Sequence, residues 1–249
     1  MSHAINKRQL REQRCAERQA AEAAERARAT RNRRLFQLGG ALGLAAIVLI
    51  AAIAVSSSGG SKPAAPSPGL LAGISEHNGV LGDPTAPVTV TEFVDLQCPI
   101  CAKASQTVVP SVINDYVRPG DVKLQARTLS FIGPDSITAA KWAHGAEQQG
   151  KLWAFLETFY ASQGQENSGY VTDSFLSDVA KASGVDASKA KAFADGASAQ
   201  AALDQADGDA QALKIDSTPS FTVTKGNGKP EVVAVGLDDL TNKLDKALS

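Results

Sequence analysis

Apolar and polar side chains alternate from residue 88 to residue 94, which is the period of a β-strand. One face of this predicted strand carries three valines and one carboxylate: Val88, Val90, Glu92 and Val94. A glutamate thus shares a face with side chains that a sheet buries.

A helix is predicted to follow this strand, beginning within Cys98-Pro99-Ile100-Cys101. Pro99 suits the first helical position, because the N–H that proline lacks has no partner there. The helix can continue to about Tyr116, with a kink at Pro110.

The remaining pattern predicts a helical block between two groups of strands. A short edge strand at 80–81 and a strand at 122–129 come before the block. From about residue 134 to 214, apolar side chains recur at helical spacing. Strands at 220–224 and 231–235 and a last helix come after it. This order predicts an α/β fold with one sheet and a helical insertion.

A different apolar pattern covers residues 35–55, where Gln37 is the only polar side chain. At about 1.5 Å per residue, a helix of this length spans about 30 Å of hydrocarbon. The chain has a net charge of −1, yet residues 1–34 hold ten Lys or Arg against four Glu. Since basic segments stay in the cytoplasm, we expect a single-pass membrane anchor with its N-terminus in the cytoplasm.

A cleaved signal peptide is the alternative interpretation of this segment, and Ala52-Ile53-Ala54 resembles a cleavage site. The basic and apolar segments are both longer than those of signal peptides, which favours an uncleaved anchor. The basic segment 1–34 is typical of a cytoplasmic tail near anionic lipid, and we expect no nucleic-acid partner. Residues 56–73, rich in Ser, Gly, Pro and Ala, predict a flexible linker. The folded domain is then 74–249, with its helical insertion at about 133–214.

The three cysteines divide between the two sides of the predicted membrane. Cys15 falls in the reducing cytoplasm, whereas Cys98 and Cys101 fall outside, where disulfides persist. A disulfide across two intervening residues restrains little chain entropy, which favours an exchanging disulfide over a structural one. A zinc site needs a second pair of ligands, and only His77 and His144 lie outside. We therefore predict neither a metal nor another cofactor.

The cysteine pair suits thiol–disulfide exchange. The start of a helix concentrates unpaired N–H groups, which stabilise a thiolate at Cys98. Cys101, one turn later, should be more buried and can resolve a mixed disulfide. A stabilised thiolate favours the reduced form and so makes the disulfide form more oxidising.

Two further features are candidates for the site. Glu92 lies six residues before Cys98 and can exchange a proton with Cys101 as that sulfur leaves. Alternatively, its carboxylate reaches water or pairs with a lysine such as Lys103. Thr218-Pro219 opens a predicted interior strand, where a cis turn would leave neighbouring backbone free to pair with an extended substrate.

Taken together, these motifs and the order of elements resemble the DsbA-like branch of the thioredoxin superfamily, over roughly residue 80 to the C-terminus. The resemblance implies a thioredoxin fold interrupted by a helical domain, a nucleophile at Cys98, a resolving thiol at Cys101 and a cis-proline at Pro219. Thr218, Pro99 and Ile100 are then expected to contact substrate. The sequence departs from the best-known oxidases in having Pro-Ile, not Pro-His, between the cysteines.

The resemblance predicts an extracytoplasmic thiol oxidase that introduces disulfides into reduced secreted polypeptides. The anchor resembles that of Gram-positive and actinobacterial relatives, which implies a membrane reoxidase of the DsbB or vitamin K epoxide reductase type. A disulfide reductase or isomerase would use the same residues in the other direction. A redox-sensing or peptide-binding membrane module is the alternative from another class.

Overall fold

The computed structural model describes residues 69–233 and 236–249. The predicted tail, the predicted anchor at 35–55, Cys15 and most of the predicted linker lie outside these residues. No helix within the described ranges is long and apolar enough to cross a membrane.

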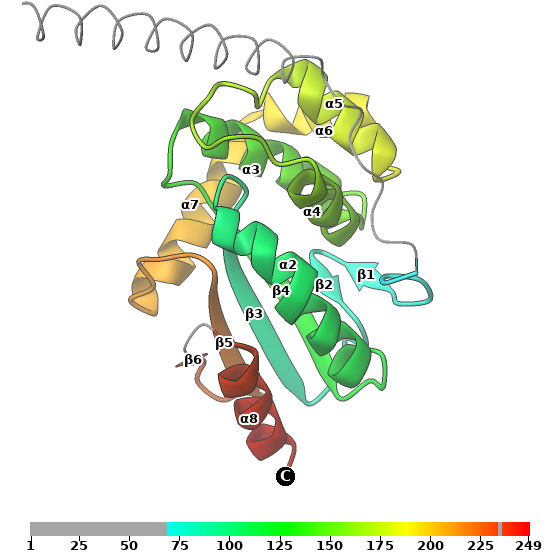
Figure 1. Ribbon diagram of the computed structural model, residues 1–249, viewed down its shortest axis with the longest axis vertical. Coiled ribbons are helices and arrows are strands. Elements are labelled where there is room, and N and C mark those ends of the chain that lie inside the picture. Colours follow the sequence, from blue (N-terminus) through cyan, green and yellow to red (C-terminus); the bar gives the residue numbers. More distant parts are fainter. Residues whose placement is uncertain (1–68, 234–235) are drawn as a thin grey trace, which may run out of the picture. The chain divides into compact units, whose positions relative to one another are not determined.

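A six-stranded sheet forms the centre of the domain, in the order β1-β2-β4-β3-β5-β6 (Figure 1). Its strands are β1 Glu76–His77, β2 Val80–Leu81, β3 Val88–Asp95, β4 Val122–Leu129, β5 Ser220–Lys225 and β6 Glu231–Val233. β3 and β4 are parallel, and the other neighbours are antiparallel.

The predicted strands are present, with one correction at the edge. The strand at 80–81 is not an edge strand, because it pairs with β4 on one side and with β1 on the other. Two-residue β1 gave no alternation from which it could be predicted.

Alternation along β3 separates two apolar clusters. Val88, Val90 and Val94 are fully buried in the main core, and Glu92 lies on their face with 3% of its surface exposed. Phe93 points to the opposite face, where it packs with Leu129. Because both faces of β3 are buried, a shift of the strand by one residue would place every side chain on the wrong face. The positions of the strand residues near the cysteines are therefore fixed.

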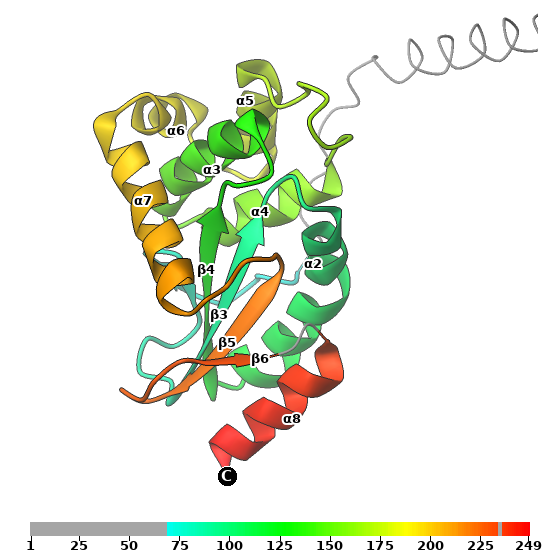
Figure 2. The same cartoon turned by 90° about the vertical axis from the view of Figure 1, so that its left-hand side faces the viewer.

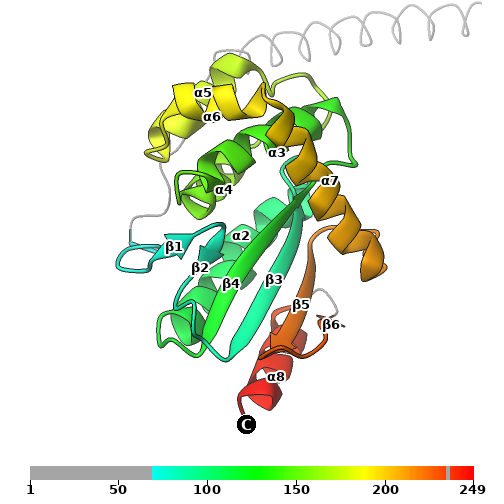
Figure 3. The ribbon, with the colours of Figure 1, turned by 180° about the vertical axis from the view of Figure 1, so that it is seen from behind.

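Two helices cover the main-core face of the sheet, and a third lies against the other face (Figure 2). The first two are α2 Pro99–Val112, which follows β3, and α8 Leu237–Leu248 at the C-terminus. The third is α7 Ala197–Ala212, which lies beside the end of β4 (Figure 3). This order of layers places the N-terminus of α2 at the end of the central strand β3.

The helix after Cys98 is less regular than its apolar spacing predicts. Beyond Pro110, α2 passes into a short π-helix, η1 Ile113–Val117, in which the Arg118 N–H donates to the Ile113 carbonyl at 2.8 Å. Proline lacks the N–H that a regular helix needs, and such points favour local widening. The helical segment thus ends at Val117, one residue later than predicted, and its last turn is a π-helix.

The helical block between β4 and β5 lies within the predicted insertion. It comprises α3 Pro134–Glu147, α4 Leu152–Ala161, α5 Asp173–Ala182, α6 Ala187–Ala194 and α7. α3 and α6 pack so closely that a Cβ on Gly145 would lie 2.6 Å from the Ala190 carbonyl oxygen. Glycine is therefore required at this crossing.

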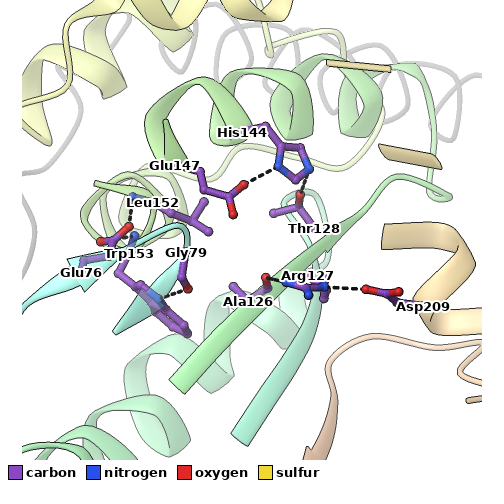
Figure 4. Close-up of polar contacts among 10 residues, drawn as sticks. All are labelled: Glu76, Gly79, Ala126, Arg127, Thr128, His144, Glu147, Leu152, Trp153 and Asp209. Atoms are coloured by element: carbon purple, nitrogen blue, oxygen red, sulfur yellow. Dashed lines mark hydrogen bonds and ion pairs between the residues drawn. The ribbon is translucent and has the colours of Figure 1, made fainter. Parts of the chain in front are cut away.

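Buried polar contacts join the insertion to the sheet (Figure 4). The Thr128 hydroxyl on β4 lies 2.9 Å from His144 Nε2 on α3, and His144 Nδ1 lies 2.7 Å from a Glu147 carboxylate oxygen. His144 is 7% exposed and belongs to this joint.

Two more joints are made by charged groups. The carboxylate of Glu76 on β1 accepts hydrogen bonds from the first N–H groups of α4, at Leu152 (2.6 Å) and Trp153 (3.2 Å). Arg127 on β4 forms an ion pair with Asp209 on α7 at 2.8 Å. The insertion is thus fixed to the sheet through α3, α4 and α7.

The start of the domain lies earlier than the sequence indicated. Leu70 and Leu71 pack against the core, and the Arg118 guanidinium donates to the carbonyls of Leu70 (2.8 Å) and Ala72 (2.9 Å). Residues 69–73, assigned to the linker by composition, therefore form part of the folded unit.

Candidate active site

Cys98 occupies the junction between β3 and α2. The strand ends at Asp95, and Cys98 is the N-cap of α2, with Pro99 at the first helical position. The Cys101 N–H points at Cys98 Sγ at 3.4 Å. The sulfur thus takes the place of the oxygen that usually caps a helix, which is where the helix dipole favours a negative charge.

The surroundings of Cys98 favour its thiolate. A hydrogen bond from the Cys101 thiol is the largest of the effects that lower the pKa of Cys98 to about 6. The Thr218 hydroxyl and the backbone N–H groups of Cys101 and Ile100 also lower this pKa, whereas burial opposes them. A thiolate is therefore populated at neutral pH, as its place at a helix start predicts.

Cys101 has the opposite character. It is fully buried, and burial raises its pKa well above the ordinary range. Its hydrogen bond to Cys98 and the negative charges of Cys98 and Glu92 raise the pKa further. The predicted difference in burial is confirmed, and the pair consists of one thiolate-forming sulfur and one that holds its proton.

Thr218 and Pro219 lie beside the cysteines, although they are 120 residues away along the chain. In the thiol form, Cys98 Sγ donates to the Thr218 carbonyl oxygen at 3.3 Å. The peptide bond between Thr218 and Pro219 is cis, as the resemblance implies. β5 begins directly afterwards and pairs with β3, which brings the two segments together.

Glu92 lies beneath the cysteines, opposite Ala126 on β4 and Phe221 on β5. Burial and, to a smaller extent, the charge of Glu157 on α4 raise its pKa to about 8. Among the described residues no ion pair to Glu92 occurs, and Lys103, named as a possible partner, is exposed. Glu92 is thus a carboxyl that holds its proton at neutral pH close to Cys101.

The turn between β3 and Cys98 is held by polar groups that the sequence gave no reason to choose. Asp95 accepts hydrogen bonds from the Gln97 N–H (2.9 Å), the Ser136 hydroxyl (2.6 Å) and the Ile132 N–H (3.2 Å). Ser136 and Ile132 come from the start of the insertion. The short Asp-x-Gln spacing is typical of an Asx turn and was the only available signal.

Side chains at the end of α4 and just beyond it complete this support. The Gln163 amide donates to the carbonyls of Leu96 (2.7 Å) and Cys98 (3.2 Å). The Tyr160 hydroxyl donates to the Asp95 carbonyl at 3.3 Å. The backbone on both sides of the turn is therefore bound by the insertion, which fixes the position of Cys98.

The surface beside Cys98 is apolar. Ile100 is 54% exposed, and Pro99 next to it is also exposed. Phe131, 53% exposed, precedes Ile132, whose N–H donates to Asp95. Exposed apolar side chains therefore lie next to Cys98.

No group of three or more His, Cys, Asp or Glu that could hold a metal ion occurs in the part of the chain that the structure describes. The arrangement instead offers two sulfurs of unequal acidity, a buried carboxyl below them and an apolar rim around the outer sulfur. This combination is suited to thiol–disulfide exchange.

Comparison with known proteins agrees with this chemistry. A family model described as thioredoxin matches residues 75–235. A probable disulfide bond formation protein D of Bacillus anthracis is 30% identical over 172 residues, covering 68% of this chain and 77% of that protein. Its counterpart in Bacillus cereus is 27% identical over 222 residues, covering 88% and 99%. The solved structure of oxidised BdbD from Bacillus subtilis has a TM-score of 0.62 and 25% identity, covering 75% and 97%.

Proposed function

The chain belongs to the thioredoxin family as a DsbA-like thiol–disulfide oxidoreductase that introduces disulfide bonds, and on that premise we propose that it oxidises reduced secreted polypeptides outside the cell membrane through Cys98 and Cys101. The observation that carries the assignment of residues is the unequal acidity of the two thiols. Burial keeps Cys101 protonated, while hydrogen bonds stabilise a thiolate at Cys98.

The reaction begins with the disulfide between Cys98 and Cys101. A substrate thiolate attacks Cys98 Sγ, the enzyme S–S bond breaks, and Cys101 leaves and takes up a proton. A second substrate thiolate then attacks its partner sulfur in the mixed disulfide, and Cys98 leaves as a thiolate. Two electrons pass from substrate to enzyme. The low pKa of Cys98 makes it a good leaving group in this second step.

Thr218 and Pro219 are placed to guide the substrate. A chain joined to Cys98 must pass the Thr218 backbone, whose carbonyl lies 3.3 Å from the sulfur. Backbone pairing at this position accepts many sequences, while Pro99 and Ile100 offer apolar contact. These four residues form the proposed substrate-binding surface.

Reoxidation requires a partner that accepts the two electrons. We propose a membrane reoxidase of the DsbB or vitamin K epoxide reductase type, reached by an enzyme that residues 35–55 anchor in the same bilayer. The length of that apolar run and the basic residues before it support this arrangement. This arrangement is tested in intact cells by introducing a single cysteine at position 20 or at position 65 and adding a thiol reagent that cannot cross the membrane. Only the cysteine at position 65 should react.

The roles of the two cysteines are tested with the full-length protein in detergent. Cys98→Ala should abolish oxidation of a dithiol peptide. Incubated with a disulfide-bonded peptide, Cys101→Ala should accumulate a mixed disulfide, because the Cys98 thiolate attacks the peptide disulfide and no second enzyme thiol is present to resolve the product. Undiminished dithiol oxidation by the Cys98 variant would contradict the assignment.

The direction of electron flow is tested by the reduction potential. Equilibration of the full-length protein with glutathione buffers should give a value towards the oxidising end of the range spanned by this fold. A value at the thioredoxin end would favour the reductase or isomerase alternative.

A further inference from the structure

Helix α4 of the insertion lies along the floor of the active site. Its Tyr160 hydroxyl donates to the Asp95 carbonyl at 3.3 Å, where β3 ends. Glu157 is three residues earlier and therefore on the same side of the helix, one turn back. The side of α4 that contacts the end of β3 therefore also carries a carboxyl.

The two carboxyls lie close enough for the charge of Glu157 to act on Glu92. Glu92 in turn faces Cys101 from α2 and Tyr160 from α4, and its charge acts on both. The described residues place no lysine or arginine in an ion pair with either glutamate. Among the described residues, the two acids therefore act on each other without an ion-paired cation, an arrangement in which the protonation of one depends on that of the other.

The two acids differ in their access to water. Glu157 is 9% exposed and Glu92 is 3% exposed, while Cys101 is fully buried. Exposure therefore rises in steps from Cys101 through Glu92 to Glu157. A proton that leaves or reaches Cys101 needs such a path, because the thiol itself has no contact with solvent.

We propose that Glu157 is the outer station of a proton path that leads from Cys101 through Glu92 to solvent, and that it acts as a positioning residue through its effect on Glu92. This inference rests on the proposed function of Cys98 and Cys101.

Proton balance along the path follows the exchange step. When a substrate thiolate forms its S–S bond to Cys98, the enzyme S–S bond breaks and Cys101 leaves with the electron pair. Glu92 gives its proton to that sulfur and becomes a carboxylate. Glu157, or water through it, returns a proton to Glu92. When the enzyme is reoxidised, Cys101 gives up its proton along the same path.

The acidities of the two groups suit this order. Burial raises the pKa of Glu157 to about 7 and that of Glu92 to about 8. The outer acid therefore exchanges protons readily at neutral pH, while the inner acid is mostly protonated and ready to donate. A purely structural residue at 157 would gain nothing from a carboxyl, because a buried acid with no partner costs stability.

The test uses Glu157→Gln in the full-length protein, with Glu76→Gln as the matched control. Glu76 is a partly buried acid whose pKa desolvation likewise raises to about 7, and it contacts the same helix, but the acid whose charge acts on it is Glu147. The readout is the pH profile of the single-turnover oxidation of a dithiol peptide, corrected for ionisation of the peptide.

Removal of the charge at 157 lowers the pKa of Glu92, so the fall in rate at high pH should move down by roughly one pH unit. Glu76→Gln should leave the profile in place. Glu157→Asp should restore it, and Glu157→Gln should have no further effect when Glu92 is already Gln. These results support the proposal.

An unchanged profile in Glu157→Gln, with wild-type unfolding by urea, would overturn it. An equal shift of the pH profile in Glu157→Gln and in Glu76→Gln would also overturn it. An additive effect of Glu157→Gln in a protein that already carries Glu92→Gln would do the same. If Glu157→Gln fails to fold, the Glu157→Asp protein decides the question. A shifted pH profile in that protein would contradict the proposal, because the proposed path needs only a carboxyl at this position. If the wild-type protein does not oxidise the dithiol peptide, the proposed function itself is refuted.

Discussion

The stabilised thiolate of Cys98 makes the stability of the reduced protein depend on pH. The pKa of this thiol falls from about 9 to about 6 on folding, so the folded state binds fewer protons than the unfolded chain between these values. The stabilisation is complete above about pH 9, declines as the pH falls and is nearly absent below about pH 6. Reduced protein should therefore lose stability on acidification through this window.

Linkage gives the size of the loss. Between pH 7.5 and 5.5 a shift of this kind removes about 2 kcal/mol, and about 1 kcal/mol remains once solvent screening at a sulfur near the surface is allowed for. Urea unfolding of the reduced full-length protein, followed by tryptophan fluorescence, measures it. Trp142 and Trp153 are both buried and report loss of the core.

The control is the reduced Cys98→Ala protein at the same pH values. Glu76, Glu92 and Glu157 titrate in both proteins, so their contributions largely cancel in the difference. Wild type should be more stable than the variant by a margin that shrinks on acidification. A margin that is constant between pH 7.5 and 5.5 would refute the idea that folding stabilises the thiolate.

Three further substitutions have definite expected results. Thr218→Val removes a hydrogen-bond donor to the Cys98 sulfur and should raise the pKa of Cys98. The thiolate absorbance near 240 nm should then appear at higher pH than in the wild type. An unchanged titration would contradict the role of the Thr218 hydroxyl. Gln163→Leu leaves the Leu96 and Cys98 carbonyls without their donor and should cost about 1 kcal/mol in urea unfolding. Gly145→Ala places a Cβ 2.6 Å from a carbonyl oxygen of α6 and should cost about 1–3 kcal/mol, detectable as a lower unfolding midpoint; wild-type stability would show that the helices separate freely.

Sequence pattern predicted the parts of this site that depend on local rules. The alternation at 88–94 placed Glu92 on the buried face, and Pro99 placed Cys98 at the start of a helix. Thr218 and Pro219 could be chosen because proline lacks a ladder N–H and suits the start of an interior strand. Each of these signals lies within a few residues of the group it identifies.

The supporting residues could not be predicted because their role comes only from long-range packing. Glu157 and Tyr160 lie on a helix that is buried on nearly every side, and its apolar spacing indicates nothing beyond a place in the core. Gln163 follows that helix and meets the Leu96 carbonyl across 67 residues of chain. A polar side chain that binds distant backbone has no periodic signature.

The dipeptide between the cysteines changes how the thiolate must be stabilised. Ile100 has no ring or charge to offer, so the low pKa of Cys98 depends on donors from Cys101, Thr218 and the backbone. Those donors act only while the turn before Cys98 keeps its position, because hydrogen bonds weaken steeply with distance and angle. Asp95 and Gln163 bind that turn to the start of α3 and the end of α4. The helical insertion therefore contributes to the reactivity of Cys98 by fixing the geometry of these hydrogen bonds. This contribution matters because Ile100 cannot stabilise the thiolate by charge.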